Sequence, residues 1–94
     1  MDIPKHLKAE GKKFYQKIAM DYSIDDEAGK ALLLTAAESW ERCQQARKIL
    51  KKEGLVLSDR FGQKKAHPAC AIERDSRQQV ISALKALNLN PGAI

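Results

Sequence analysis

The stretch Gly54-Leu-Val-Leu-Ser-Asp-Arg-Phe-Gly-Gln-Lys-Lys-Ala-His-Pro68 decides the fold, because it separates two long helical patterns. The pattern before it must end near Glu53, since glycine favours the position just after a helix. Pro68 suits the first turn of the next helix, because the N–H group that proline lacks has no helical partner there. The stretch is therefore expected to connect two helices.

Within this connection, residues 55–57 (Leu-Val-Leu) are typical of a short strand, and Phe61-Gly62 indicates a turn. Residues 63–66 can return as a partner strand and complete a minimal hairpin, or they can form an irregular loop. We expect a positively charged hairpin or loop displayed between two helices. Its cationic side chains are Arg60, Lys64, Lys65 and, at lower pH, His67.

The rest of the chain predicts helices. Apolar residues at helical spacing begin at Leu7, and the polar segment 22–26 ends that first helix. Residues 27–53 contain no strong helix breaker and predict a second helix about 40 Å long. We therefore predict one mainly α domain over residues 1–94. It has three helices that include a long central helical hairpin element, with a short β-hairpin or loop between the second and third helices.

Each predicted helix has an apolar face suited to burial. Gly11 lies on the first of these faces and is expected to allow close packing against another helix. The three faces comprise Leu7, Gly11, Phe14, Tyr15, Ile18 and Ala19; then Ala28, Leu32, Ala36, Trp40, Cys43, Ala46 and Leu50, widened by Leu33, Ala37 and Ile49; then Ile72, Val80, Ile81, Leu84 and Leu87.

Chain length favours assembly into an oligomer. A chain of 94 residues buries only about 60–65% of its unfolded surface, so a second copy can cover apolar surface that one chain leaves exposed. The second predicted helix is also longer than so small a domain needs. We expect part of it to pack within the subunit and part against neighbouring copies. The candidate interface residues are Leu33, Ala37, Trp40 and Ile49.

The net charge of +5 is unevenly distributed. Residues 47–65 carry seven Lys or Arg against two acidic residues, whereas the flanking regions are nearly neutral. Cations in the last turn of a helix complement its dipole, but those of the connection have no such explanation. A basic patch of this kind suits a phosphate backbone or an acidic protein. The candidate DNA-binding residues are Arg60, Lys64, Lys65, Lys51, Lys52 and His67.

Other classes of function find little support. No glycine-rich phosphate loop or nucleophile–base arrangement is present, so we do not expect an enzyme or a cofactor. The acidic run 25–27 suits a helix N-terminus and needs no metal, and no metal site is expected. Cys43 and Cys70 lack zinc-type spacing and are expected to be reduced. No apolar run reaches membrane-spanning length, and we expect an intracellular, soluble protein.

Several motifs resemble those of the small subunit of tailed-phage terminases. Asp59-Arg60-Phe61-Gly62-Gln63 is followed by His67-Pro68-Ala69 and then by Ile72-Glu73-Arg74-Asp75. The resemblance extends to residues 7–15 and 84–91, and therefore covers nearly the whole chain. Each motif residue also has a plain structural explanation: Phe61 can fill the core, Gly62 can serve the turn, and Asp59 can pair with Arg60.

This resemblance implies a non-catalytic partner of the large terminase subunit, which holds the ATPase and nuclease. Such small subunits assemble into rings, recognise double-stranded viral DNA and regulate its cutting and packaging. The resemblance places the protein in the cytoplasm of a bacterial host, as a phage or prophage product. Many relatives have a longer basic segment before the first helix. Because only six residues precede Leu7 here, weaker DNA binding or dependence on ring avidity is expected.

The residues themselves leave a second function open. The chain can be a helical oligomeric adaptor whose cations bind an acidic protein without contacting DNA. The break between the first two helices does not predict a helix-turn-helix, because the second helix begins with the apolar run 32–34 (Leu-Leu-Leu) instead of a polar recognition face. Salt-dependent binding to duplex DNA distinguishes the two functions.

Overall fold

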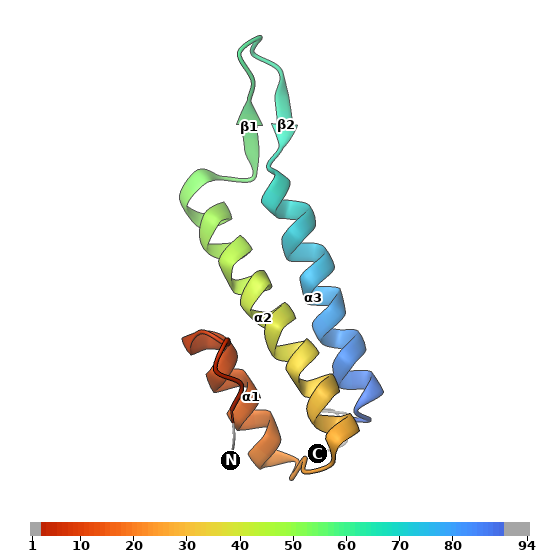
Figure 1. Ribbon diagram of the computed structural model, residues 1–94. Coiled ribbons are helices and arrows are strands. Elements are labelled where there is room, and N and C mark those ends of the chain that lie inside the picture. Colours follow the sequence, from red (N-terminus) through yellow and green to blue (C-terminus); the bar gives the residue numbers. More distant parts are fainter. Residues whose placement is uncertain (1–2, 90–94) are drawn as a thin grey trace.

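The computed structural model describes residues 3–89, which form three helices and a two-stranded antiparallel sheet (Figure 1). The prediction of a mainly α fold with three helices is confirmed, and residues 55–67 adopt the hairpin alternative. In chain order the elements are α1 (Ala9–Asp21), α2 (Glu27–Glu53), β1 (Val56–Ser58), β2 (Lys64–Ala66) and α3 (Pro68–Ala86).

The two longest helices, α2 and α3, lie side by side and run in opposite directions (Figure 1). The hairpin projects beyond the end where α2 stops and α3 starts, and α1 packs along α2 nearer the opposite end. The molecule is therefore elongated, with extents of 54 × 29 × 20 Å. No helix within residues 3–89 combines the length and the apolar character that a membrane span requires.

Local residues explain where α2 begins and ends. The Asp26 carboxylate accepts a hydrogen bond from the Gly29 N–H group at 2.9 Å and caps the N-terminus of the helix. At the other end, Gly54 adopts a positive φ of 86°, a conformation that glycine reaches without a Cβ clash. The chain therefore leaves the helix at Gly54 and turns into β1, as the sequence predicts.

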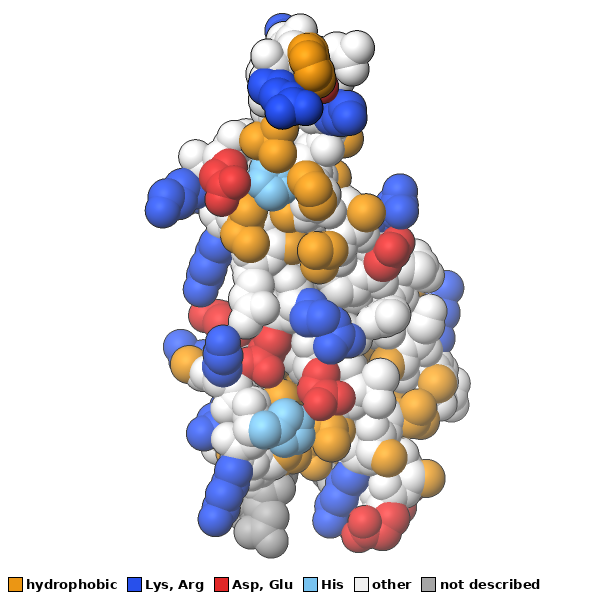
Figure 2. Space-filling view, turned by 45° about the horizontal axis from the view of Figure 1, so that its top comes forward, with side chains coloured by type: hydrophobic (Ala, Val, Ile, Leu, Met, Phe, Trp, Pro, Cys, Tyr) orange, Lys and Arg blue, Asp and Glu red, His pale blue; other side chains and the backbone are white. Residues whose placement is uncertain are grey.

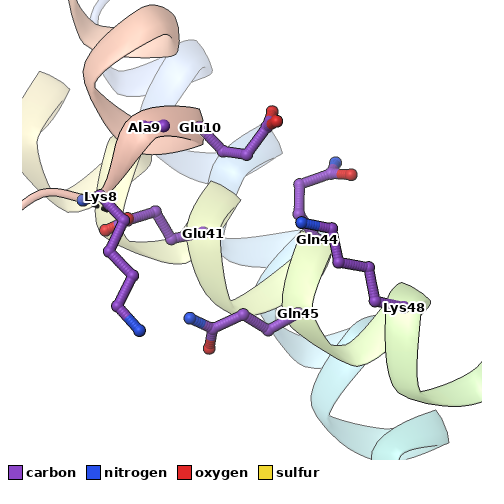
Figure 3. Close-up of a pocket in the computed structure, with 7 residues that line it drawn as sticks. All are labelled: Lys8, Ala9, Glu10, Glu41, Gln44, Gln45 and Lys48. Atoms are coloured by element: carbon purple, nitrogen blue, oxygen red, sulfur yellow. Dashed lines mark hydrogen bonds between the residues drawn. The ribbon is translucent and has the colours of Figure 1, made fainter.

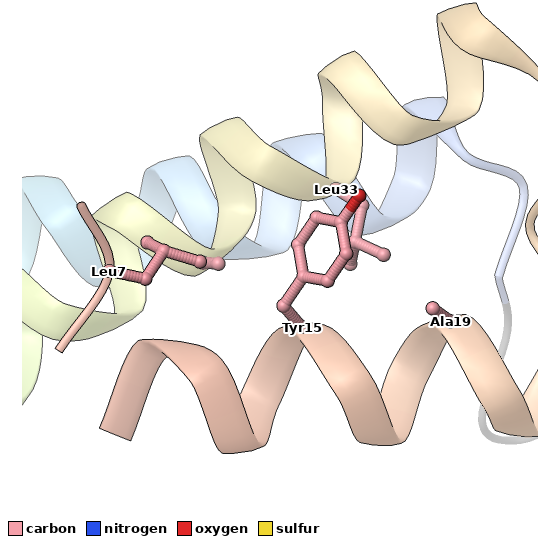
Figure 4. Packing of buried hydrophobic residues seen from close by; sticks show 5 residues of the cluster. Leu7, Tyr15, Ala19 and Leu33 are labelled. Carbon is pink, nitrogen blue, oxygen red and sulfur yellow. The ribbon is translucent and has the colours of Figure 1, made fainter. Parts of the chain in front are cut away.

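The main cluster of buried apolar side chains lies between α1 and α2 (Figure 4). Tyr15 and Ala19 of α1 pack against Leu33 of α2, and Leu7 closes the cluster ahead of α1. The rings of Phe14 and Trp40 stack beside this cluster with their centroids 5.1 Å apart. The predicted apolar face of the first helix is confirmed.

Two candidate interface residues belong to this core. Leu33 and Ala37 have no exposed surface, because α1 covers the face of α2 on which they lie. The expectation that these two residues contact a neighbouring copy is therefore corrected. Trp40 keeps partial exposure beside Phe14, and Ile49 is 40% exposed, so these two candidates stay available to a neighbour.

The seam between α2 and α3 is built from small side chains, which allow two helix backbones to approach closely. On α2 the buried seam residues are spaced alternately three and four apart, as in helices that pack along each other at a small crossing angle. Polar groups in the seam are satisfied across it, since the Ser39 hydroxyl donates to Gln79 Oε1 at 3.0 Å. The buried residues are Ala36, Ser39, Cys43 and Ala46 of α2, and Ala69, Ser76, Val80 and Ala83 of α3.

The predicted buried face of α3 is partly wrong. Val80 is buried as predicted, but Ile72 and Ile81 are 50% and 40% exposed. The buried face instead passes through Ser76, which is 3% exposed and donates its hydroxyl to the carbonyl oxygen of Ile72. Close helix approach selects small residues for the seam, and this packing requirement overrides the hydrophobicity on which the prediction depended.

A carboxylate of α2 caps the N-terminus of α1. The Lys8 N–H group donates to Glu41 Oε2 at 2.6 Å, and no side chain of α1 itself provides this cap. Figure 3 shows Glu41 reaching from α2 to the start of α1 beside a shallow cleft. A Cβ atom on Gly11 would lie 2.6 Å from Glu41 Cδ, so the absence of a side chain at Gly11 makes this contact possible.

A double-mutant cycle tests this contact. We expect Glu41→Ala to lower the free energy of unfolding by about 0.5–2 kcal/mol, because α1 then has no cap. In the Glu41→Ala background, Gly11→Ala should stabilise the protein by about 1 kcal/mol through higher helix propensity. In the wild-type background that gain should disappear, because the new methyl group displaces Glu41. Urea unfolding measures all four proteins, and an equal effect of Gly11→Ala in both backgrounds would contradict the contact.

Candidate nucleic-acid interface

The β-hairpin stands away from the helices and exposes both of its faces (Figure 1). Its strands pair Val56 with Ala66 and Ser58 with Lys64. The ladder extends at its base, where the His67 N–H group donates to the Leu55 carbonyl at 2.8 Å. All six strand residues are exposed, so the hairpin contributes no side chain from its strands to the subunit core.

A single aspartate organises the turn at the tip. Asp59 Oδ1 accepts hydrogen bonds from the N–H groups of Phe61 at 2.8 Å and Gln63 at 2.9 Å. Gly62 has a φ of 77° and donates its N–H to the Asp59 carbonyl at 3.0 Å. The expected turn role of Gly62 is confirmed. The sequence also allowed an ion pair between Asp59 and Arg60. Asp59 instead holds the turn by accepting hydrogen bonds from backbone N–H groups.

The tip presents an aromatic ring to solvent. Phe61 is 74% exposed, so the possibility that it fills the core is wrong. The guanidinium carbon of Arg60 lies 4.9 Å from the centroid of the Phe61 ring, which is a cation–π contact. Such contacts contribute about 0.5–1 kcal/mol at exposed sites. The tip therefore combines a flat apolar group with a positive charge.

Five of the six candidate DNA-binding residues are exposed cations at this end of the molecule. Three of them lie on the hairpin, and two occupy the last turn of α2. Figure 2 shows Lys and Arg side chains around the projecting end, next to an exposed hydrophobic side chain. Within residues 3–89, none of the five lies in an ion pair. The five are Arg60, Lys64, Lys65, Lys51 and Lys52.

Unlike the cations of the hairpin, the arginines near the α2–α3 contact lie in ion pairs. Glu73 Oε1 lies 3.5 Å from Nε of Arg47 and 3.5 Å from Nε of Arg77, so one carboxylate holds two guanidinium groups. Arg74 contacts Asp75 at 3.1 Å. The Glu73–Arg77 pair lies within α3 at i,i+4 spacing, which sequence alone indicates, whereas the Arg47 contact joins α2 to α3 and depends on a register that only packing determines. The charge of this region is already partly compensated.

The sixth candidate, His67, has a structural role instead. Its side chain is 10% exposed, and its Nδ1 atom accepts a hydrogen bond from the Ala69 N–H group at 3.0 Å. Because Nδ1 accepts, the proton resides on Nε2, which donates to Glu53 Oε1 at 3.0 Å. His67 thus caps α3 and ties its start to the end of α2. Both ring nitrogens are thus occupied within the subunit and the side chain is only 10% exposed, so His67 is not included in the proposed DNA contact.

Other chemistry has little foundation in the described part of the chain. No group of three or more His, Cys, Asp or Glu side chains within residues 3–89 is arranged to hold a metal ion. Cys43 is buried and Cys70 is partly buried, and both are free thiols, as expected. The shallow hollow at the hairpin base is lined mainly by apolar residues, which include Leu55 and Pro68. The arrangement suits binding of an extended anionic partner at the projecting end.

Substitution of His67 tests its structural role. We expect His67→Ala to lower the free energy of unfolding by about 1–2 kcal/mol, because it removes both the cap of α3 and the bond to Glu53. His67→Asn should recover part of this loss, since asparagine caps helices well but is too short to reach Glu53. Urea unfolding compares the three proteins. Equal stability of His67→Ala and wild type would contradict the assignment.

Comparison with known proteins identifies the family. Comparison with curated proteins and with solved structures gave no match. The family model described as "Phage terminase, small subunit" matches residues 11–94, which include both long helices and the hairpin. The match therefore covers most of the chain and agrees with the motifs at residues 59–63 and 67–75. The chain belongs to the family of phage terminase small subunits.

Proposed function

We propose that this chain is a non-catalytic DNA-recognition component of a phage packaging machine. It binds double-stranded viral DNA and regulates the large subunit, which carries the ATPase and nuclease, in the cytoplasm of the bacterial host. Family membership supports a packaging role. The observation that carries DNA binding is the set of exposed cations on the projecting hairpin and the adjacent turn of α2, which form no ion pair within residues 3–89.

The geometry suits contact with a duplex. From Leu55 to Asp59, where the turn begins, the hairpin extends about 13 Å, at about 3.3 Å per residue. Lys64 and Lys65 point to opposite faces of the strand, because side chains alternate along it. The hairpin can therefore place positive charge toward phosphates on both of its sides. Such contacts give affinity without sequence information and release bound counterions.

Assembly into a homo-oligomer, in the form of a ring, is the second part of this proposal. The described part of one chain leaves several large apolar side chains at least 38% exposed. Some of them lie on α2 and α3, where a neighbouring copy can cover them. A ring also multiplies weak individual DNA contacts into useful avidity. These exposed residues are Met20, Ile49, Leu55, Val56, Leu57, Phe61, Ile72 and Ile81.

Charge removal on the hairpin tests DNA binding. The variant Arg60→Ala/Lys64→Ala/Lys65→Ala should bind duplex DNA more weakly, because up to three phosphates are no longer neutralised. The slope of log affinity against log salt should fall by up to about 2.7, or roughly 0.9 for each of these phosphates. Fluorescence anisotropy at a series of salt concentrations measures both quantities.

A matched control removes the same charge elsewhere. Lys12, Lys13 and Lys17 are exposed on α1, far from the hairpin, and the described residues give them no ion pair. Replacing these three with alanine should change the slope much less. Equal losses in the two triple variants would contradict a specific role for the hairpin. If the wild-type protein binds no duplex DNA even at low salt, the acidic-protein adaptor becomes the better function.

Light scattering tests assembly. We expect the wild-type protein to have a solution mass several times that of one chain. Ile49→Asp should lower this mass, because a carboxylate in an apolar contact between copies is costly to desolvate. Met20→Asp is the matched control, since Met20 is 62% exposed on α1, away from the α2–α3 surface. A wild-type monomer would argue against the ring.

A further inference from the structure

The hairpin tip exposes more apolar surface than a purely electrostatic DNA contact requires. Phe61 is 74% exposed, and its fractional exposure exceeds that of every other large hydrophobic residue in the described chain. It is one of the two central residues of the turn that the Gly62 N–H to Asp59 carbonyl hydrogen bond closes. Lysines alone would supply affinity for phosphates. The aromatic ring therefore calls for a separate function.

The turn holds this ring in place. Asp59 accepts hydrogen bonds from the N–H groups of Phe61 and Gln63, and its carbonyl accepts one from Gly62. These bonds fix the backbone on both sides of Phe61, and the exposed ring contacts the Arg60 guanidinium. A rigid presentation lowers the entropy that is lost when a side chain binds.

We propose that Phe61 is a wedge that inserts between two stacked base pairs of duplex DNA from the minor groove. This inference rests on the proposed DNA-binding function and deepens it. Apolar side chains inserted in this way partly unstack a base step and kink the duplex by about 20–90°. The flat phenyl ring can stack on a base, and Arg60 beside it brings a positive charge into a groove of negative potential.

The dimensions agree with this arrangement. The minor groove is about 7.5 Å deep and about 6 Å wide, so the narrow tip can enter while the strands stay outside. The hairpin extends roughly 13 Å before its turn, so α2 and α3 lie behind the tip that meets the groove. Phe61 is 74% exposed, so most of its surface is free to contact DNA. Lys64 and Lys65 then lie at the level of the flanking phosphate backbones.

The proposal also gives a source of sequence preference. In the minor groove the pattern of donors and acceptors on the base edges is largely degenerate, so side chains beside Phe61 gain little sequence information there from hydrogen bonds. A wedge instead reads deformability, because pyrimidine–purine steps such as TA and CA unstack most easily. We therefore expect the protein to favour duplexes with such a step at the point of insertion, without a strict consensus on either side.

The test measures DNA bending and affinity together, with the full-length chain. A short duplex with a central TA step carries fluorescent dyes at its two ends, and energy transfer between them reports the bend. We expect wild-type protein to bend this duplex. Phe61→Ala should abolish the bend and weaken binding by about tenfold, whereas the salt slope should stay unchanged, because no charge is removed. Phe61→Tyr, which keeps a stacking ring, should bend the duplex as wild type does.

The charge variant provides the opposite control. Arg60→Ala/Lys64→Ala/Lys65→Ala keeps Phe61, so at saturating protein concentration it should still bend the duplex while its salt slope falls. If Phe61→Ala binds and bends DNA as wild type does, the wedge is wrong and the proposed DNA binding stands. A lower oligomer mass for Phe61→Ala at unchanged DNA bending would place the ring against a second copy and overturn the wedge. If wild-type protein binds no duplex DNA, the proposed function and the wedge both fail.

Discussion

Close contact between α2 and α3 is the constraint on which the rest of the structure depends. The two helices meet along small residues such as Ala36, Ala46 and Ala83, so their backbones lie close together over most of their length. Short side chains contribute little buried apolar area, and the larger cluster is confined to the α1–α2 contact. The subunit therefore has a narrow core and leaves Ile49, Ile72 and other large residues exposed. The proposed assembly into a ring would cover part of this exposed apolar surface.

The same helix pair determines where the hairpin can point. Because α2 ends and α3 begins at the same end of the molecule, the connection between them must leave and return at that end (Figure 1). His67 links the two helix ends through Glu53 and the Ala69 N–H group, so the base of the hairpin is held on both sides. Asp59 holds the tip in the same way through backbone N–H groups. The hairpin is thus fixed at its base and at its tip although none of its strand residues is buried.

Two kinds of cation follow from this arrangement. Arg47 and Arg77 share the carboxylate of Glu73 and help to join α2 and α3. Lys64 and Lys65 have no ion pair within the described chain and project from the hairpin. A charge already compensated within the subunit has less to gain from an anionic partner. Cations held in ion pairs therefore lie along the helices, whereas the cations proposed to bind DNA lie at the projecting end.

The sequence by itself determined the order and type of the elements. Gly54 and Pro68 set the end of α2 and the start of α3 through their backbone conformations, and the clustered lysines mark the charged connection. Both signals are local properties of the sequence. The tertiary structure alone decided which side chains each helix buries. Ser76 replaced Ile72 in the seam because helix separation, not hydrophobicity, selects residues there. Tertiary packing also buried His67 and left Phe61 in solvent. The burial of a side chain depends on which residues, distant in the sequence, pack against it. Hydrophobic periodicity identifies the apolar face of a single helix. The register between two helices depends on how both pack together, so the pattern of one helix cannot predict it.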